Sequence, residues 1–195
     1  MGKTISGFTE ETTQNLLLDT GAFYVNFEID TDTLETASTK LLGATSGGGN
    51  FEAKPNFRDI KVDGVKGKAK GLKILESWSV TMGASLLELK KEVLQKALAV
   101  TTTTTTTVNT KNYSKIEGKN VIENTDYIDN ITWIGSLSGS GEPVIIQVFN
   151  CLNTEGLKLN PKDSEDIVAE LNFEGHYSVD NLDNPPFAIY YPTIV

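Results

Sequence analysis

The chain is poor in the residues that build disulfides and metal sites. Its 195 residues include one cysteine, Cys151, and one histidine, His176. A single cysteine excludes an intrachain disulfide framework and suits synthesis in a reducing cytosol. One histidine does not suffice for a common zinc site, and the sequence does not predict a Cys–His pair. We therefore expect both residues to be structural, and we expect no metal and no cofactor.

Long apolar runs are also missing. No stretch of about 18 apolar residues occurs, so the sequence predicts neither a transmembrane helix nor a membrane anchor. The first 15 residues, MGKTISGFTEETTQN, lack the apolar region of a signal peptide, so Sec export is not expected. The hydrophobic content of 38% suffices for a packed core. We expect one domain over residues 1–195, which includes a polar arm at 1–15.

Basic residues are scarce in the second half of the chain. Residues 1–100 carry 12 basic and 13 acidic side chains, whereas residues 101–195 carry 5 basic and 13 acidic ones. The net charge of -9 repels phosphate backbones and disfavours tight binding of nucleic acid. A passage that DNA crosses without sticking would need the same sign. Solubility explains the charge equally well, and composition alone favours that simpler explanation.

Apolar residues alternate with polar ones over much of the chain, which predicts β-strands. The expected strands are 16–29, 51–62, 65–70, 72–82, 127–137, 143–152, 157–159, 167–177 and 187–191. One helix is expected at 85–99, because its apolar residues recur every three to four positions and Ser85 with Glu88 fits a capping box. These elements predict a mostly β (α+β) fold, a β-sandwich or small barrel of two packed antiparallel sheets with one flanking helix.

Three segments do not fit this scheme directly. A long loop is expected at about 40–57, because it contains Gly47, Gly48 and Gly49. The run of seven threonines, 101–107, is either a strand of low specificity or a loose linker, since identical side chains do not distinguish two faces. Residues 113–126 indicate an exposed excursion, so that about 101–126 is expected to be an insertion.

The clearest enzymatic motif is Leu-Leu-Asp-Thr-Gly-Ala at 17–22. Aspartic proteases of the retroviral type carry such a motif at the catalytic aspartate, which would be Asp19. Phe23 follows where those proteases carry a small or acidic residue, and a second Asp-Thr-Gly is missing, so activity would require a symmetric dimer. The structural alternative, which we favour, is a turn in which Gly21 supplies permissive backbone angles.

A cluster of basic side chains surrounds the predicted turn at Asp63-Gly64. The cluster consists of Arg58, Lys61, Lys66, Lys68, Lys70 and Lys73. Binding of nucleic acid would need interleaved aromatic residues and is opposed by the overall acidity. We favour lysines that guard an edge hairpin against illegitimate pairing, or that face acidic groups of a neighbouring subunit.

Four ordered segments carry a family resemblance. They are NLLLDTGAFYVN at 15–26, GATSGG at 43–48 leading into Arg58-Asp59-Ile60 and an Asp-Gly turn, the helix expected at 85–99, and the closing VAELNFEGHY at 168–177 with PFAIY at 186–190. Together they resemble the major tail protein, or tail tube protein, of long-tailed, siphovirus-type bacteriophages. The threonine run and 113–126 match nothing in that family's pattern.

The resemblance implies a structural virion protein and no enzyme. Hexameric rings would stack into a tail tube that conducts DNA without binding it specifically. Partners would be other copies of the chain, the tape measure protein, and the tail terminator and distal tail proteins, in the phage tail, after synthesis in the cytoplasm of a bacterial host. Contacts between subunits or rings are expected at Thr45, Gly47, Gly48, Gly49, Phe51, Phe57, Arg58 and Asp59. A β-sandwich binding or decoration module of a virion is the alternative, and a retropepsin-like protease the third possibility.

Overall fold

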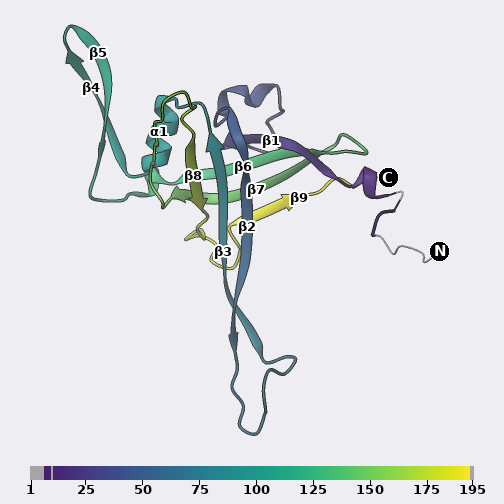
Figure 1. The fold of residues 1–195 in the computed structure, drawn as a ribbon. Coiled ribbons are helices and arrows are strands. Elements are labelled where there is room, and N and C mark those ends of the chain that lie inside the picture. The colour runs from purple at the N-terminus through teal and green to yellow at the C-terminus, as the bar shows by residue number, and fades with distance from the viewer. Residues whose placement is uncertain (1–6, 10, 194–195) are drawn as a thin grey trace.

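The computed structural model describes residues 7–9 and 11–193 and, of Asp19, the backbone alone, and these residues contain nine β-strands and one α-helix (Figure 1). The strands are β1 (Leu17–Val25), β2 (Thr45–Asp59), β3 (Lys73–Leu86), β4 (Thr101–Val108), β5 (Lys111–Gly118), β6 (Ile128–Leu137), β7 (Pro143–Asn153), β8 (Ala169–Glu174) and β9 (Phe187–Tyr190). The helix is α1 (Lys91–Leu98), and short 3₁₀ helices span Thr12–Gln14, Thr36–Lys40 and Asn124–Asp126.

All of these strands except β4 and β5 belong to one antiparallel sheet. Its order is β1-β6-β7-β8-β3-β2, and β9 also pairs with β7. Strand β7 pairs with β6 along most of its length, but only Leu152 and Asn153 at its end reach β8. The sheet therefore bends there, and β2, β3 and β8 cross the other strands at a steep angle (Figure 1). Two antiparallel layers with a flanking helix result, which confirms the predicted mostly β fold class.

Apolar side chains fill the space between the two layers. In β3, Val80, Met82 and Leu86 share one face because side chains alternate along a strand, and each is at most 1% exposed. Helix α1 adds the buried Val93 and Ala97. The main core consists of Phe23, Leu42, Val80, Met82, Ala84, Leu86, Val93, Ala97, Ile131, Val148, Cys151, Leu171 and Phe173. Removing this apolar area from water stabilises the two-layer arrangement.

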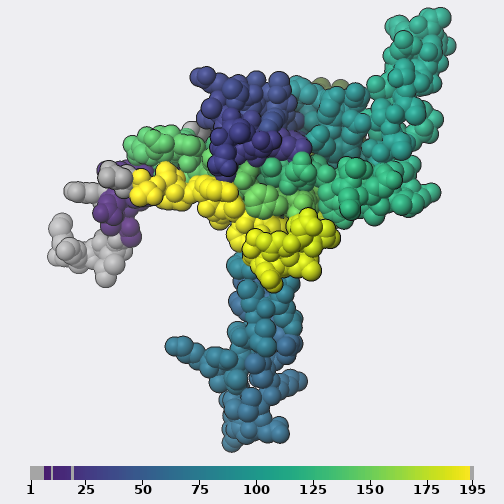
Figure 2. Space-filling view, turned by 180° about the vertical axis from the view of Figure 1, so that it is seen from behind, coloured from purple at the N-terminus to yellow at the C-terminus, as the bar shows by residue number. Residues whose placement is uncertain are grey.

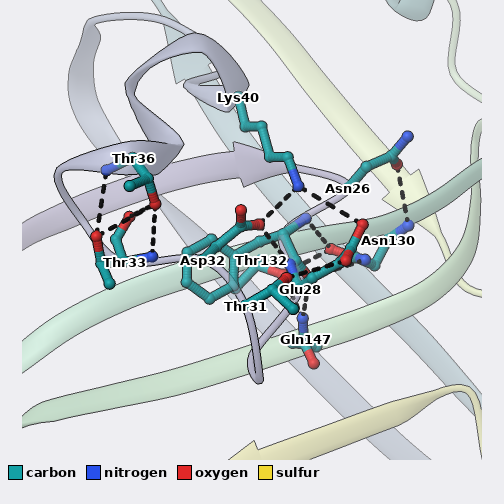
Figure 3. A network of polar contacts seen from close by, with 11 residues as sticks. Asn26, Glu28, Thr31, Asp32, Thr33, Thr36, Lys40, Asn130, Thr132 and Gln147 are labelled. Atoms are coloured by element: carbon teal, nitrogen blue, oxygen red, sulfur yellow. Dashed lines mark hydrogen bonds and ion pairs between the residues drawn. The ribbon is translucent and has the colours of Figure 1, made fainter.

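A buried polar network holds the chain where it leaves β1 (Figure 3). Asn130 on β6 accepts a hydrogen bond of 3.0 Å from the Phe27 N–H and donates one of 3.2 Å to the Phe27 carbonyl. Gln147 on β7 donates to the same carbonyl and to the Thr132 hydroxyl, each at 2.9 Å. These side chains satisfy backbone groups that would otherwise be costly to bury.

An ion pair continues this network toward the surface (Figure 3). The Glu28 N–H donates to Asp32 Oδ2 at 2.8 Å, and Lys40 Nζ lies 2.6 Å from the same oxygen. The Glu28 N–H and, after it, Lys40 hold the pKa of Asp32 below its usual value. The connection between β1 and β2 is therefore anchored at both ends, although it contains no strand.

The predicted helix at 85–99 begins too early. Ser85 and Leu86 end strand β3, where Ser85 pairs with Glu170 of β8, and α1 begins at Lys91. Pairing with β8 overrides the local capping signal of Ser85 and Glu88, and Lys90 stands at the N-cap instead. The first predicted strand, 16–29, extends too far. The observed strand β1 ends at Val25, because Asn26 adopts a left-handed φ of 53°.

Two predicted strands are absent from the part of the chain that the structure describes. Residues 65–70 lie in the 60–72 connection between β2 and β3, where Gly64, Gly67 and Gly71 have φ values of 83°, 95° and 91°. Such left-handed angles interrupt a regular strand. Residues 157–159 are irregular and follow a turn at Gly156, whose φ is 72°.

The loop predicted at about 40–57 is wrong over most of its length, because β2 begins at Thr45. Gly47 and Gly48 form an irregularity in β2, with φ values of 90° and 77°, and pairing with β3 is regular from Gly49 to Asn56. The glycine run resembles a loop in the sequence because glycine has no side chain to pack. Hydrogen bonding to β3 nevertheless orders this part of the chain as a strand.

The threonine run forms a strand. Strands β4 and β5 pair in register from Thr101↔Gly118 to Val108↔Lys111 and form a separate two-stranded sheet. Asn109 and Thr110 connect them with φ values of 47° and 66°, the pattern of a type I′ turn. The insertion predicted at about 101–126 is therefore a β-ribbon followed by the short helix Asn124–Asp126. Of the predicted arm, residues 1–6 and 10 lie outside the described chain.

Candidate assembly surface: the projecting β2–β3 hairpin

The outer half of the β2–β3 hairpin projects away from the two-layer body (Figures 1 and 2). A bulge between Asn56 and Phe57 shifts the register where the hairpin leaves the body. Beyond it, Phe57 pairs with Leu75, Arg58 with Ile74, and Asp59 with Lys73. We define the hairpin arm as residues 57–76. Its two strands hold one another, but they pair with no further strand in the described chain.

The tip of the arm is an open loop with hydrogen bonds at its base and across its turns. The Ile60 N–H donates to the Leu72 carbonyl at 2.8 Å, and the Val65 N–H donates to Val62 at 3.2 Å. The loop surrounds a hollow of about 370 Å³, whose lining includes Ile60, Val62, Val65 and Leu72. These apolar side chains face a space that the described residues leave open.

Large apolar side chains of the arm are exposed to solvent. Phe57 is 52% exposed and Leu75, its cross-strand partner, is 48% exposed. Ile60, Val62, Val65 and Ile74 are exposed as well. Contiguous exposed apolar residues of this kind mark interaction surfaces more often than isolated ones do. The arm thus presents apolar area that a second molecule would remove from water.

The arm is basic, whereas the rest of the chain is acidic. Residues 57–76 carry six basic and three acidic side chains, and the remainder carries 11 basic and 23 acidic ones. Arg58 Nε lies 2.6 Å from Glu76 Oε1, and Lys73 Nζ lies 3.1 Å from Asp59 Oδ1. Within the described residues, no carboxylate lies within ion-pair distance of the remaining lysines of the arm, which are Lys61, Lys66, Lys68 and Lys70. Their charge is available to a partner.

The structure separates the eight residues predicted as contacts into two groups. Phe57, Arg58 and Asp59 lie on the arm, as described above. The other five lie in the body part of β2: Thr45, Gly47, Gly48, Gly49 and Phe51. There Phe51 pairs with Met82, and its ring lies 6.0 Å from that of Phe187.

The body part of β2 also lines a cavity of about 420 Å³ between the layers, together with Phe23 and Trp133. Gly49 has a packing role there, because a Cβ atom at this position would collide with the Gly83 carbonyl and the Phe23 ring. The glycine segment, where contacts were expected, thus belongs to the subunit's own sheet, whereas the lysine-rich segment projects from the body. The sequence did not reveal that the arm exposes apolar side chains, because exposed and buried strands show similar alternation.

The Asp-Thr-Gly motif lies inside β1, at an irregularity between Leu18 and Ala22. Gly21 has a φ of 64°, and the Trp133 indole N–H donates to the Thr20 carbonyl at 2.9 Å. A Cβ atom on Gly21 would collide with the Trp133 indole. The backbone therefore accounts for Gly21 without catalysis, while the Asp19 side chain lies outside the described part.

The lone histidine and cysteine are packed in the body. His176 Nδ1 lies 3.0 Å from the Asn150 carbonyl oxygen, and its ring meets Tyr127 edge-on with centroids 5.2 Å apart. Cys151 is fully buried, and burial raises the pKa of its thiol to about 12. Among the described residues, no group of three or more His, Cys, Asp or Glu is arranged to hold a metal ion.

Comparison with protein-family models and with curated proteins identifies no relative. No protein-family model matches the chain, and no curated protein gives a significant match. In the portion that the structure describes, no helix has both the length and the apolar character needed to cross a membrane.

Proposed function

We propose that this chain is a structural virion protein that polymerises as stacked, hexameric rings and forms the tail tube of a long-tailed phage. The observation that carries the proposal is the hairpin arm, an exposed basic and apolar projection on an otherwise acidic molecule. The ordered resemblance to tail tube proteins supplies the ring number and the role in conducting DNA. The tape measure, tail terminator and distal tail proteins are proposed as partners on the same basis.

Polymerisation follows from the shape of the arm. A projection of this kind can insert against a different surface on the next copy. A contact between two different surfaces is heterologous, so it continues from copy to copy and builds rings or filaments. Burial of the exposed Phe57 and Leu75 would contribute roughly 25 cal/mol per Å² of apolar area.

Another copy of the chain offers an acidic segment for the arm. Residues 154–183 carry eight acidic and two basic side chains, and they lie in the body rather than on the arm. Opposite charges across an interface steer association and fix its register. The basic arm and the acidic segment of the same sequence therefore form a complementary pair between copies.

Open sheet edges support the same proposal. Strands β1 and β2 stand at the two ends of the sheet order, and each has one side without a continuous partner strand among the described residues. Exposed edges invite pairing with other chains and aggregation, and closing a ring pairs them. In a ring whose subunits pair through these end strands, the edges would be hydrogen-bonded and would form the wall of a tube.

Charge reversal on the arm tests the proposal. In sedimentation velocity runs, Lys66→Glu with Lys68→Glu is expected to remove the large assemblies that the natural chain forms, because the arm would then repel the acidic segment. The matched control is Lys90→Glu with Lys91→Glu, an equal change of charge on exposed residues of the body. Equal loss of assembly in both variants would contradict a role for the arm.

Two further measurements distinguish the tube protein from a protease and from a binding module. Asp19→Asn should leave assembly unchanged in a tube protein. Peptide cleavage that Asp19→Asn abolishes would identify an aspartic protease instead. A saturable affinity for a glycan, with no assembly at any concentration, would identify a binding module.

A further inference from the structure

A second projection, the β4–β5 ribbon, stands out from the body on the side away from the hairpin arm (Figures 1 and 2). In the described chain, its strands pair only with one another. Contacts near its base include a hydrogen bond of 2.7 Å from Gln95 Nε2 to the Thr103 hydroxyl and one of 3.1 Å from the Lys119 N–H to the Val100 carbonyl. An isolated two-stranded sheet is marginally stable in water, so this ribbon gains from additional strands.

The register shows which backbone groups of the ribbon are free. In an antiparallel pair, residues that exchange both hydrogen bonds alternate with residues whose N–H and C=O groups point outward. Val108 and Lys111 flank the two-residue turn and are a bonded pair. Counting back from them, Thr101, Thr103, Thr105 and Thr107 direct their backbone groups to the outer edge of β4. Ser114, opposite Thr105, is the equivalent outward position on β5.

The two edges of the ribbon differ in protection. Strand β5 carries Lys111, Lys115 and Glu117, and charged side chains discourage the pairing of an edge with another strand. Strand β4 consists of seven threonines and a valine, with no charge and no proline. β-branched residues favour extended backbone, so this edge has high strand propensity and no guard.

We infer that β4 pairs edge to edge and antiparallel with β4 of a second copy, forming a four-stranded sheet with the order β5-β4-β4-β5. A two-fold contact uses the same edge on both molecules, so no second surface is required. The identical side chains place threonine opposite threonine in several registers, and such pairs are favourable. A specific register, which identical residues do not encode, is not needed for this contact.

The position of the ribbon permits this contact between two acidic molecules. Each chain has a net charge of -9, which opposes a close approach of two bodies. The ribbon extends beyond the body, so that the edges meet before the bodies do (Figure 2). The contact is independent of the hairpin arm and of the proposed tube, and it would link copies in different rings or tubes.

Proline scanning of the two edges tests the inference. The Lys66→Glu, Lys68→Glu variant, whose arm is expected not to make contacts, is expected to dimerise with rising concentration in sedimentation equilibrium runs. Thr105→Pro removes one outward N–H from β4 without breaking the ribbon, and it is expected to weaken dimerisation at least about tenfold. Ser114→Pro removes the equivalent N–H from β5 and is expected to leave the dimer intact.

Hydrogen exchange of the same background chain supplies a test that needs no proline variant. The amides of Thr103, Thr105 and Thr107 are expected to gain protection as the concentration rises, while the Ser114 amide stays unprotected. A chain that remains monomeric at its highest soluble concentration would overturn the inference, as would equal weakening by the two prolines. Because the arm is disabled throughout, neither result depends on whether the natural chain forms tubes.

Discussion

Arg58 and Glu76 face each other across the base of the hairpin arm, with Arg58 Nε 2.6 Å from Glu76 Oε1. Both side chains are about half exposed, at 57% and 49%. An ion pair in contact with water contributes little to folding, typically about 0–1 kcal/mol. The pair holds two charged groups in place on the arm, where the proposed contact between copies would meet them.

Arg58→Ala is therefore expected to separate folding from assembly. The free energy of unfolding, measured in urea, should fall by less than about 1 kcal/mol. The concentration needed for assembly should rise, because the arm loses one positive charge and part of its contact surface. A fall of several kcal/mol in the unfolding free energy would place Arg58 in the folded core instead of on a contact surface.

Gly21→Ala is expected to destabilise the body. Gly21 has a φ of 64°, and an added Cβ atom would collide with the Trp133 indole, so we expect a loss of about 2–4 kcal/mol in thermal or urea unfolding. Gly64→Ala is the control, because its φ is 83° but no atom lies near the added Cβ. It should lose only about 1–2 kcal/mol. Similar losses for both would show that the contact with Trp133 is unimportant.

Thr110→Gly is expected to stabilise the β4–β5 ribbon. A β-branched residue at a φ of 66° is strained, and Asn-Gly is the favoured sequence of a type I′ turn. Amides of the ribbon should exchange more slowly, by about tenfold, which corresponds to about 1.4 kcal/mol. Thr107→Gly should do the opposite, since glycine inside a strand weakens it. Faster exchange in Thr110→Gly would argue against the turn.

Acid is expected to loosen the connection between β1 and β2. The Glu28 N–H and Lys40 hold the pKa of Asp32 below its usual value of about 4 in the folded chain. Its contribution to stability is therefore complete above that unfolded value and is lost as the pH falls through the lower folded pKa. Asp32→Asn should flatten this part of the pH profile of urea unfolding. An unchanged profile would assign the acid sensitivity to other carboxylates.

Sequence patterns predicted those strands that are rich in apolar residues and bounded by clear turn residues, such as Gly139 and Gly141. Strands β6 and β7 lie within about one residue of the predicted 127–137 and 143–152, because their apolar residues fill the core between the layers. The start of the helix was mispredicted, because Ser85 pairs with Glu170 across the sheet, a contact between distant residues. Local capping chemistry carries no information about such a contact.

The candidate contact surface was predicted only in part, for a similar physical reason. Phe57 lies between the polar residues Asn56 and Arg58, an alternation that a half-buried strand also shows, so the sequence does not reveal that the β2–β3 hairpin leaves the body. Glycines at 47–49 suggest a mobile loop, although Gly49 is fixed by its close approach to Gly83 and Phe23. Both the exposure of the hairpin and the order of the glycine segment depend on the path of the chain in space, which the alternation of residues does not encode.

Negative-stain electron microscopy of the concentrated natural chain tests self-assembly most directly. The proposed function predicts hexameric rings that stack into hollow tubes, and the loss of both when Lys66 and Lys68 are replaced by glutamate. Particles that remain single subunits over a wide range of concentration and ionic strength, with neither rings nor tubes, would contradict it.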